Sequence, residues 1–444
     1  MTSAQLLPPG PSLNRDEMWR LEQEPAMLEE FRHSYGDLFT LHRPSQPPRV
    51  CLSSPRHFRS ILLRHDQQLT ALGPTIYNDL IGPHSMLKLA GAEHRRIRQT
   101  VTPLFTGASL QRKADTVHAL ITQGLNELAG RPPQPLARAM IRITARIMNS
   151  FIFPDDLPAT TEHVLEDELV AVLNALHDAR TAPLSLRAHL ETQYHYHRSE
   201  LDRVLLAEIA RARMKGAQRG DSLLSALLTA PRPLNDRDIR DQIVSVLTGG
   251  TTTAGNGISM ALYWLYHRPD VAARVSEEVH ALPKDASARE IASLPYLSAV
   301  CTEALRIPTV TPTSAARRVD TAFTAEGFHF AEGTHVIVAI HLAHHHEPTY
   351  PDHAEFRPER FLNQRPSSMR YLPFGIGSHY CLGAQLTELE MRLALAAAVR
   401  LEDFDVLGAD ERLRPRSHGV NLTTPHTIRA CLAAPDELTQ RQRG

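Results

Sequence analysis

Apolar residues recur every three to four positions over several long stretches of this chain, which is the spacing of one helix face. The pattern predicts helices over residues 115–126, 160–178, 191–214, 223–229, 235–267, 296–307 and 384–400. Short apolar runs bounded by turn residues predict strands over residues 49–52, 328–330, 336–340 and 427–432. The chain should therefore be mainly α with small β-sheets.

The composition excludes several classes of protein. The 444 residues are 42% hydrophobic and 22% charged, which is normal for a globular protein with a sizeable core. The formal net charge of -1 gives no general attraction to nucleic acid or to membrane surfaces. No stretch approaches the ~20 apolar residues of a membrane span, and the N-terminus has no signal-peptide pattern. The four cysteines are too far apart for a disulfide framework, which indicates a reducing, cytoplasmic compartment; they are Cys51, Cys301, Cys381 and Cys431.

Cys381 carries the strongest chemical signal in the chain. It lies in the run Phe374-Gly375-Ile376-Gly377-Ser378-His379-Tyr380-Cys381-Leu382-Gly383. The helix predicted over 384–400 begins directly after this run, and the positive end of a helix dipole favours a thiolate. A lone cysteine cannot form a zinc knuckle, but it can be the single axial ligand of a haem. The alternative is a small core residue, because cysteine is commonly buried.

The whole run resembles the haem-binding signature of the cytochrome P450 family, aromatic-Gly-x-Gly-x-His-x-Cys-x-Gly, and every defining position is filled. The resemblance implies the cytochrome P450 fold, a triangular helical prism with small sheets. It implies haem b (iron protoporphyrin IX) as the cofactor, with Cys381 as the axial iron ligand. It also places Phe374 and His379 at the cofactor.

The resemblance extends over nearly the whole sequence, and no repeat or long linker divides it. We therefore expect one domain over residues 1–444. Within it, residues 1–18 should form an extended lead-in and residues 435–444 a C-terminal tail.

Small residues and threonines interrupt the helix predicted over 235–267, in the segment Gly249-Gly250-Thr251-Thr252-Thr253-Ala254-Gly255-Asn256-Gly257. Each glycine costs a helix ~1 kcal/mol relative to alanine, so the segment needs a reason, either a close helix crossing or a flat ligand. It resembles the family's oxygen-binding helix, small-Gly-x-acid-Thr. Carried over by position, Gly250 lies at the haem and Thr253 assists the oxygen chemistry.

Thr252 departs from that pattern, because the family usually has an aspartate or glutamate there. A hydroxyl cannot do the general acid work of a carboxylate. Three explanations stay open. The neighbouring threonines can hold a water chain, the substrate can supply a proton, or the reaction is not simple hydroxylation.

Cations are expected around the two propionates of a haem, because an arginine fork matches a carboxylate. His94 and Arg98 are four residues apart on one helical face and resemble the family's His-x-x-x-Arg helix. His379 matches a position that contacts a propionate. Arg317 matches the remaining propionate-binding arginine of the family. The sequence does not decide between Arg317 and its neighbour Arg318 for this position.

A buried ion network is implied by two further segments. Glu303 and Arg306 are three apart on one helix face, which by itself is a common and weak pair. Arg360 lies in a run that resembles the family's Phe-x-Pro-x-Arg element. The resemblance implies that these three side chains meet and hold the segment that leads to Cys381.

Histidines gather before Glu347-Pro348, at His341, His344, His345 and His346. Such a cluster suggests a metal site, but a motif without ligand geometry is weak evidence. We expect a surface connection here and no metal.

The resemblance implies a monooxygenase that uses O2 and takes electrons from an external ferredoxin or flavodoxin with its NAD(P)H reductase. The substrate should be a mid-sized, mostly apolar secondary metabolite. The segments expected to face it are 70–90, 170–200, Val246–Gly250 and Thr309–Thr313. Thr252 keeps open a non-hydroxylating haem-thiolate enzyme that is peroxide-dependent or catalyses rearrangement, coupling or nitrogen chemistry. A haem-binding sensor or carrier is the third reading.

Overall fold

The computed structural model describes residues 6–73, 77–154, 157–181, 184–216, 220–307, 309–364, 366–401, 403–410, 412–418 and 421–432. The tail expected over 435–444 lies outside these residues. The first helix begins at Arg15, inside the segment expected to be an extended lead-in.

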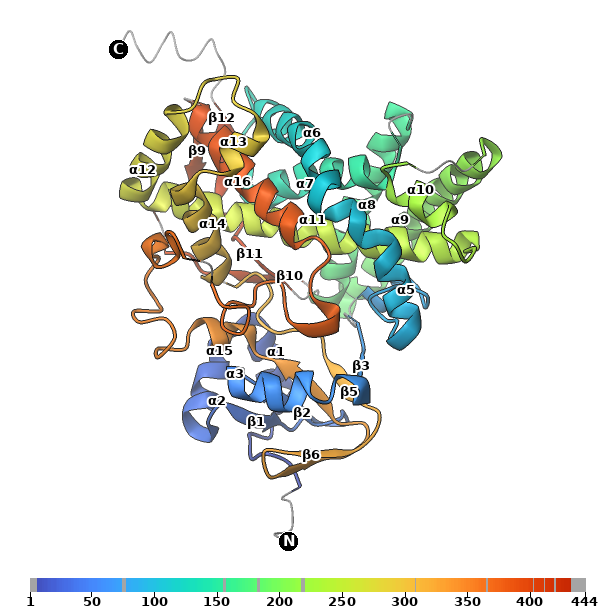
Figure 1. Cartoon of the computed structure of the whole chain (residues 1–444), viewed down its shortest axis with the longest axis vertical. Coiled ribbons are helices and arrows are strands. Elements are labelled where there is room, and N and C mark those ends of the chain that lie inside the picture. Colours follow the sequence, from blue (N-terminus) through green and yellow to red (C-terminus); the bar gives the residue numbers. More distant parts are fainter. Residues whose placement is uncertain are drawn as a thin grey trace.

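Helices make up most of the molecule (Figure 1). Their bounds are α1 (Arg15–Gln23), α2 (Met27–Tyr35), α3 (Pro55–His57), α4 (Asn78–Ile81), α5 (Gly91–Val101), α6 (Gly107–Asn126), α7 (Leu136–Ile152), α8 (Ala159–Thr181), α9 (Leu184–Met214), α10 (Leu223–Leu228), α11 (Asp236–His267), α12 (Pro269–His280), α13 (Ala288–Ala292), α14 (Pro295–Arg306), α15 (Ile340–His344) and α16 (Ala384–Arg400). Among the described residues, no helix is both long and apolar enough to cross a membrane.

The largest sheet lies at the N-terminal end of the molecule, below the main body of helices in Figure 1. Its five strands run in the order β1-β2-β8-β5-β3, with β2 and β8 parallel. The smaller sheets are β10-β11, β4-β12-β9 and β6-β7. The strand bounds are β1 (Leu38–Leu41), β2 (Arg49–Leu52), β3 (Leu69–Ala71), β4 (Gln134–Pro135), β5 (Arg317–Val319), β6 (Phe323–Ala325), β7 (Phe328–Phe330), β8 (His335–Val338), β9 (Phe404–Leu407), β10 (Arg416–His418), β11 (Asn421–Thr423) and β12 (Arg429–Leu432).

Helix α11 runs through the middle of the helical part and packs against α7, α14 and α16. The Asn235 side chain caps it by accepting a hydrogen bond from the amide of Asp238. Gly255 marks the crossing with α7, because a Cβ at this position would lie 2.8 Å from the Ile141 backbone. Close packing on several sides therefore explains part of the small-residue segment.

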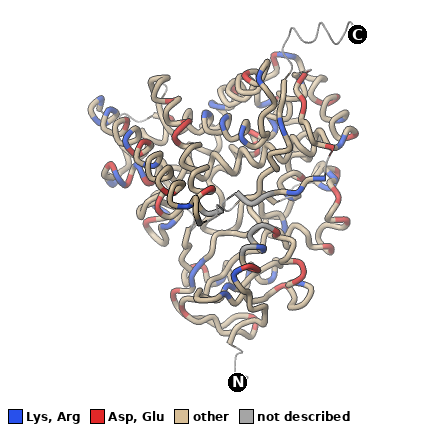
Figure 2. The backbone as a smooth tube through the Cα atoms, turned by 180° about the vertical axis from the view of Figure 1, so that it is seen from behind, with Lys and Arg blue, Asp and Glu red and all other residues tan. Residues whose placement is uncertain are grey.

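The predicted helices and strands are all present, most with bounds shifted by a few residues. The strand expected over 336–340 ends at Val338, and Ile340 already begins α15. Helix α7 was not predicted, although its sequence is strongly amphipathic. Acidic and basic positions are intermixed along the backbone seen from behind, in keeping with the balanced net charge (Figure 2).

Candidate active site

Cys381 opens into a cavity between α11, α5, the N-terminal sheet and the loop before α16. Most of the exposed surface in this cavity is apolar, and its lining includes Leu62, Ala71, Met86, Leu87, Phe105, Val246, Gly249, Gly250, Ser314, Ala315, Val338 and Leu386. Two of the segments expected to face a substrate, 70–90 and Val246–Gly250, are thus in the wall. Of the described residues in 170–200 and Thr309–Thr313, none belongs to the lining.

The loop that carries Cys381 is fixed by its own backbone. The Cys381 amide donates to the Phe374 carbonyl at 2.9 Å, and the Tyr380 amide donates to the Gly377 carbonyl at 3.0 Å. Gly375 and Gly377 have φ of 72° and 80°, a region that favours glycine. Phe374 lies beside the loop, where its ring meets the Tyr380 ring edge-on, and it is not among the lining residues.

The thiol of Cys381 is exposed toward the cavity, while protein atoms crowd its other sides. This crowding raises the pKa of Cys381, and the Gly383 amide and Arg98 oppose the rise only in part. A cation bound in the cavity would supply the missing stabilisation of the anion.

Four predicted site residues meet at one side of the same cavity. The rings of His94 and His379 are stacked with centroids 4.1 Å apart. Arg98 donates to the Tyr380 carbonyl at 3.0 Å, and Arg317 donates to the Ile376 carbonyl at 3.1 Å. Burial, together with His94 and Arg317, lowers the pKa of His379 to about 3. These four side chains place hydrogen-bond donors and positive charge on one side of the cavity.

Arg317, rather than Arg318, takes part in this group. Arg317 is buried and pairs with Asp66 at 2.5 Å, whereas the Arg318 side chain is half exposed and pairs with Asp320. Successive residues of a strand point to opposite faces, and this alternation separates the two on β5.

The site residues fit a haem. Two arginines and two histidines line the cavity, so their donors can bind the two carboxylates of a porphyrin. Arg317 also pairs with Asp66, which is not among the lining residues. A single thiol faces the same space. On α11, a Cβ added to Gly249 would meet no described atom within 4 Å, so this residue leaves room for a flat group. Gly250 also lines the cavity, but its missing Cβ makes room for Met148.

The two threonines singled out on α11 face different surroundings. Thr253 lines the cavity, and its hydroxyl donates to the Gly249 carbonyl one turn back. Thr252 is buried and is not among the lining residues; its hydroxyl contacts the Thr248 carbonyl at 3.5 Å and the Asn421 amide at 3.4 Å. The structure thus separates two residues that the sequence places side by side.

Glu390 on α16 lines the cavity and was missed by the sequence analysis. Its side chain is 1% exposed, and neither carboxyl oxygen has a hydrogen-bond partner among the described residues. Burial raises its pKa well above the ordinary value, which favours the neutral form. The sequence did contain a signal for this residue: Glu390 lies four residues after Leu386, on a helix face that is otherwise apolar.

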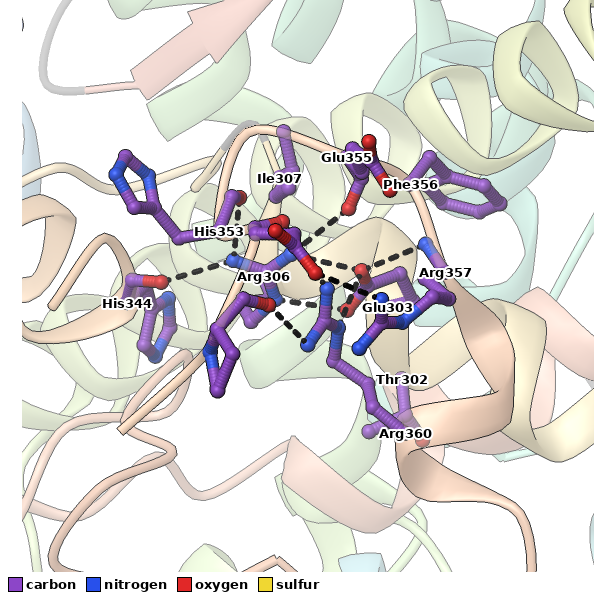
Figure 3. A network of polar contacts seen from close by, with 12 residues as sticks. Thr302, Glu303, Arg306, Ile307, His344, His353, Glu355, Phe356, Arg357 and Arg360 are labelled. Carbon is purple, nitrogen blue, oxygen red and sulfur yellow. Dashed lines mark hydrogen bonds and ion pairs between the residues drawn. The ribbon is translucent and has the colours of Figure 1, made fainter. Parts of the chain in front are cut away.

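The predicted ion network is present away from the cavity (Figure 3). Arg306 holds both carboxyl oxygens of Glu303 at 2.7 Å, and Arg360 donates to one of them at 3.0 Å. The Glu303 and Arg306 side chains are fully buried. Further donors and acceptors in the network are the Arg357 amide and the carbonyls of His344, His353 and Glu355.

The expectation of a surface connection at the histidine cluster is wrong for His345, which is 8% exposed, and for His344. This side chain is 0% exposed, and its ring bridges the Thr309 hydroxyl at 3.0 Å and the Leu372 amide at 2.8 Å. An amide can only donate, so the Nε2 atom of His344 accepts and Nδ1 carries the proton. The residue links the network to the segment that leads into the Cys381 loop.

Comparisons with known proteins identify the family of the chain. The family model described as Cytochrome P450 matches residues 10–432. Cytochrome P450 135A1 of Mycobacterium tuberculosis is 28% identical over 434 residues, covering 95% of this chain and 94% of that protein. Cyclooctat-9-en-7-ol 5-monooxygenase of Streptomyces melanosporofaciens is 27% identical over 69% of each chain. Among solved structures, retinoic acid bound cyanobacterial CYP120A1 matches with a TM-score of 0.82 and 22% identity, covering 96% of this chain and 99% of that one.

Proposed function

The chain belongs to the cytochrome P450 family, and we propose that it hydroxylates a mid-sized, mostly apolar organic molecule in the cavity beside Cys381. The observation that carries the proposal is the meeting of one thiol, two arginines and two histidines in a single, mostly apolar cavity. Thiolate-bound haem supplies the oxygen chemistry, because electron density from sulfur favours O–O cleavage. The enzyme is a monooxygenase, and its cofactor is haem.

The protein's part is to bind and orient the cofactor and the substrate. We assign the iron ligand to the Sγ atom of Cys381 and the propionates of haem b to Arg98, Arg317, His94 and His379. Their positions in one cavity support this assignment. Phe374 acts through its carbonyl, which holds the amide of Cys381.

Proton delivery is assigned to Thr253 and Glu390. Both line the cavity, and burial raises the pKa of the Glu390 carboxyl well above its ordinary value, which favours the protonated form. Thr252 has no acidic proton and is directed toward Asn421. A carboxylic acid on α16 thus takes the part that the acid before the threonine has elsewhere in the family, with the Thr253 hydroxyl and water between the carboxyl and the substrate.

The substrate class follows from the cavity wall. Leu62, Met86, Leu87 and Phe105 offer aliphatic and aromatic surface, and apolar pockets with few polar groups bind apolar ligands. The Streptomyces relative acts, by its name, on cyclooctat-9-en-7-ol, a mid-sized and mostly apolar alcohol. We propose a terpenoid-like metabolite as substrate, O2 as oxidant, and a separate ferredoxin or flavodoxin with its NAD(P)H reductase as electron donor.

The spectrum of the reduced, carbon monoxide-treated protein tests the proposal. The absorbance band characteristic of sulfur-ligated haem is expected, and Cys381→Ser should abolish it while haem still binds. An unchanged spectrum in this variant would exclude Cys381 as the ligand. Titration with candidate metabolites should then shift the haem band for apolar, mid-sized compounds.

A second function, a haem-thiolate enzyme that uses peroxide, is favoured by one observation, the lack of an acid at Thr252. Turnover with hydrogen peroxide and no redox partner, at a rate above that with electrons and O2, would select it. Turnover that depends on the redox partner would select the monooxygenase reaction.

A further inference from the structure

Glu29, His341 and His345 converge where α2 packs against α15. We propose that they form a site for one divalent transition-metal ion, with zinc the best suited. One possible ligand atom of each residue lies within 4.8 Å of the other two. The two histidines come from the cluster in which the sequence indicated no metal, and the carboxylate comes from a helix 312 residues away in the chain. The site lies apart from the cavity that contains Cys381.

The distances are close to those of a zinc site. The Nε2 atom of His341 is 2.9 Å from Oε1 of Glu29. The rings of His341 and His345 are stacked with centroids 4.1 Å apart. Tetrahedral zinc with bonds of about 2.1 Å separates its ligand atoms by roughly 3.4 Å. The three atoms lie within 4.8 Å of one another here, so binding an ion would require side-chain rotations that bring them closer.

The hydrogen bond of His345 prepares its other nitrogen to bind a metal. Its Nδ1 atom is 2.9 Å from the His341 carbonyl oxygen. Because a carbonyl only accepts, Nδ1 carries the proton and Nε2 keeps a free lone pair. Histidines that bind metals usually hold their second nitrogen in this way.

Two imidazoles and one glutamate are a donor set that zinc accepts, with a fourth position left for water. The Glu29 side chain is 37% exposed and that of His341 12%, which gives an ion access from solvent. His353 packs edge-on against His345, and its buried Nδ1 atom has no partner among the described residues, so a further donor is near.

Other charged groups around the site are already engaged. Arg32 donates to the carbonyls of Leu342 and His345 at 2.9 and 3.3 Å, and Arg306 is paired with Glu303. The carboxylate of Glu29 therefore remains to balance the charge of the ion. A bound ion would join α2 to the segment that follows β8 and stabilise this end of the molecule.

Zinc binding to the haem-loaded protein tests the proposal, because bound haem occupies Cys381. After treatment with a chelator and its removal, the protein is titrated with zinc against a chromophoric competitor. One zinc per chain is expected. Glu29→Gln and His341→Gln should weaken this binding at least ~10-fold, whereas His33→Ala, an exposed histidine on the same helix, should leave it unchanged.

Equal zinc affinity in the four proteins would overturn the proposal, since it would show adventitious binding at surface histidines. Thermal unfolding gives a second measurement. Zinc should raise the unfolding temperature of the wild type and of His33→Ala, reversibly with chelator, and should not raise that of Glu29→Gln or His341→Gln. A loss of stability in these two variants without any effect of zinc on the wild type would show a simple ion pair and also overturn the proposal.

Discussion

At the residue scale, Glu390 is a carboxyl group held in α16 without a hydrogen bond to any described residue. Burying a polar group without a partner costs free energy, and ionising it there would cost more. Such groups are concentrated at functional sites, and this one lines the same cavity as Thr253. Its raised pKa has a consequence for stability that can be measured separately from turnover.

Glu390→Gln should remove a pH dependence of folding. Above about pH 4.5 the unfolded chain releases this proton, while the folded chain keeps it up to its raised pKa. The wild type therefore loses stability as the pH rises through this interval, by up to about 1.4 kcal/mol per pH unit. In denaturant titrations between pH 5 and 8, the free energy of unfolding of the variant should increase relative to that of the wild type as the pH rises.

Glu332→Gln, at an exposed position after β7, is the control. Its stability should depend on pH in the same way as that of the wild type. Parallel curves for Glu390→Gln as well would mean that the carboxyl is ionised in the folded protein. In turnover assays, Glu390→Gln should form less product per electron consumed than the wild type does.

At the element scale, α11 has two kinds of glycine. Gly255 is required by the crossing with α7, since a Cβ would lie 2.8 Å from the backbone of Ile141. A Cβ on Gly257 would lie 3.6 Å from Leu305, which is an ordinary contact. The sequence does not distinguish the two positions from each other, because both are glycines in one helix.

Alanine substitutions on α11 should therefore have opposite effects. Gly255→Ala should lower the free energy of unfolding by about 1–3 kcal/mol, because the overpacked helices must move apart. Gly257→Ala, two residues on, should raise it by up to about 1 kcal/mol through helix propensity. Denaturant midpoints at constant m-value measure both. A loss of equal size at the two positions would contradict the packing difference.

At the scale of the whole molecule, the Glu303 network joins segments that are far apart in sequence. Arg306 holds the carbonyls before the 3₁₀ helix Pro358–Phe361, and His344 carries the connection to Leu372. The chain then continues into the Cys381 loop. The ions hold the segment that positions the thiol, and removal of one partner leaves the others buried without compensation.

Glu303→Ala should cost about 3–5 kcal/mol of stability and yield protein that does not retain haem. Glu200→Ala, which removes a surface pair with Arg203, should change stability little and keep full haem content. Haem content from absorbance and unfolding free energy from denaturant titration measure the two effects. Normal haem content in Glu303→Ala would show that the network does not position the loop.

The sequence by itself determined those features that depend on neighbouring residues. Helix α11 begins at its Asn235 cap, α16 follows the Cys381 loop, and positive-φ glycines shape that loop. Caps, turns and helix breaks act within a few residues, so a sequence pattern is sufficient to place them. The network of Glu303 was also foreseen, but only through resemblance to a family.

The tertiary structure alone decided which side chains share a space. It selected Arg317 over Arg318, turned Thr253 to the cavity and Thr252 away, and buried Glu390 without a hydrogen-bond partner among the described residues. It also brought Glu29 against His341 across nearly the whole chain. Burial, pKa and the proximity of distant residues arise from the packing of elements against each other, and no local pattern contains that information.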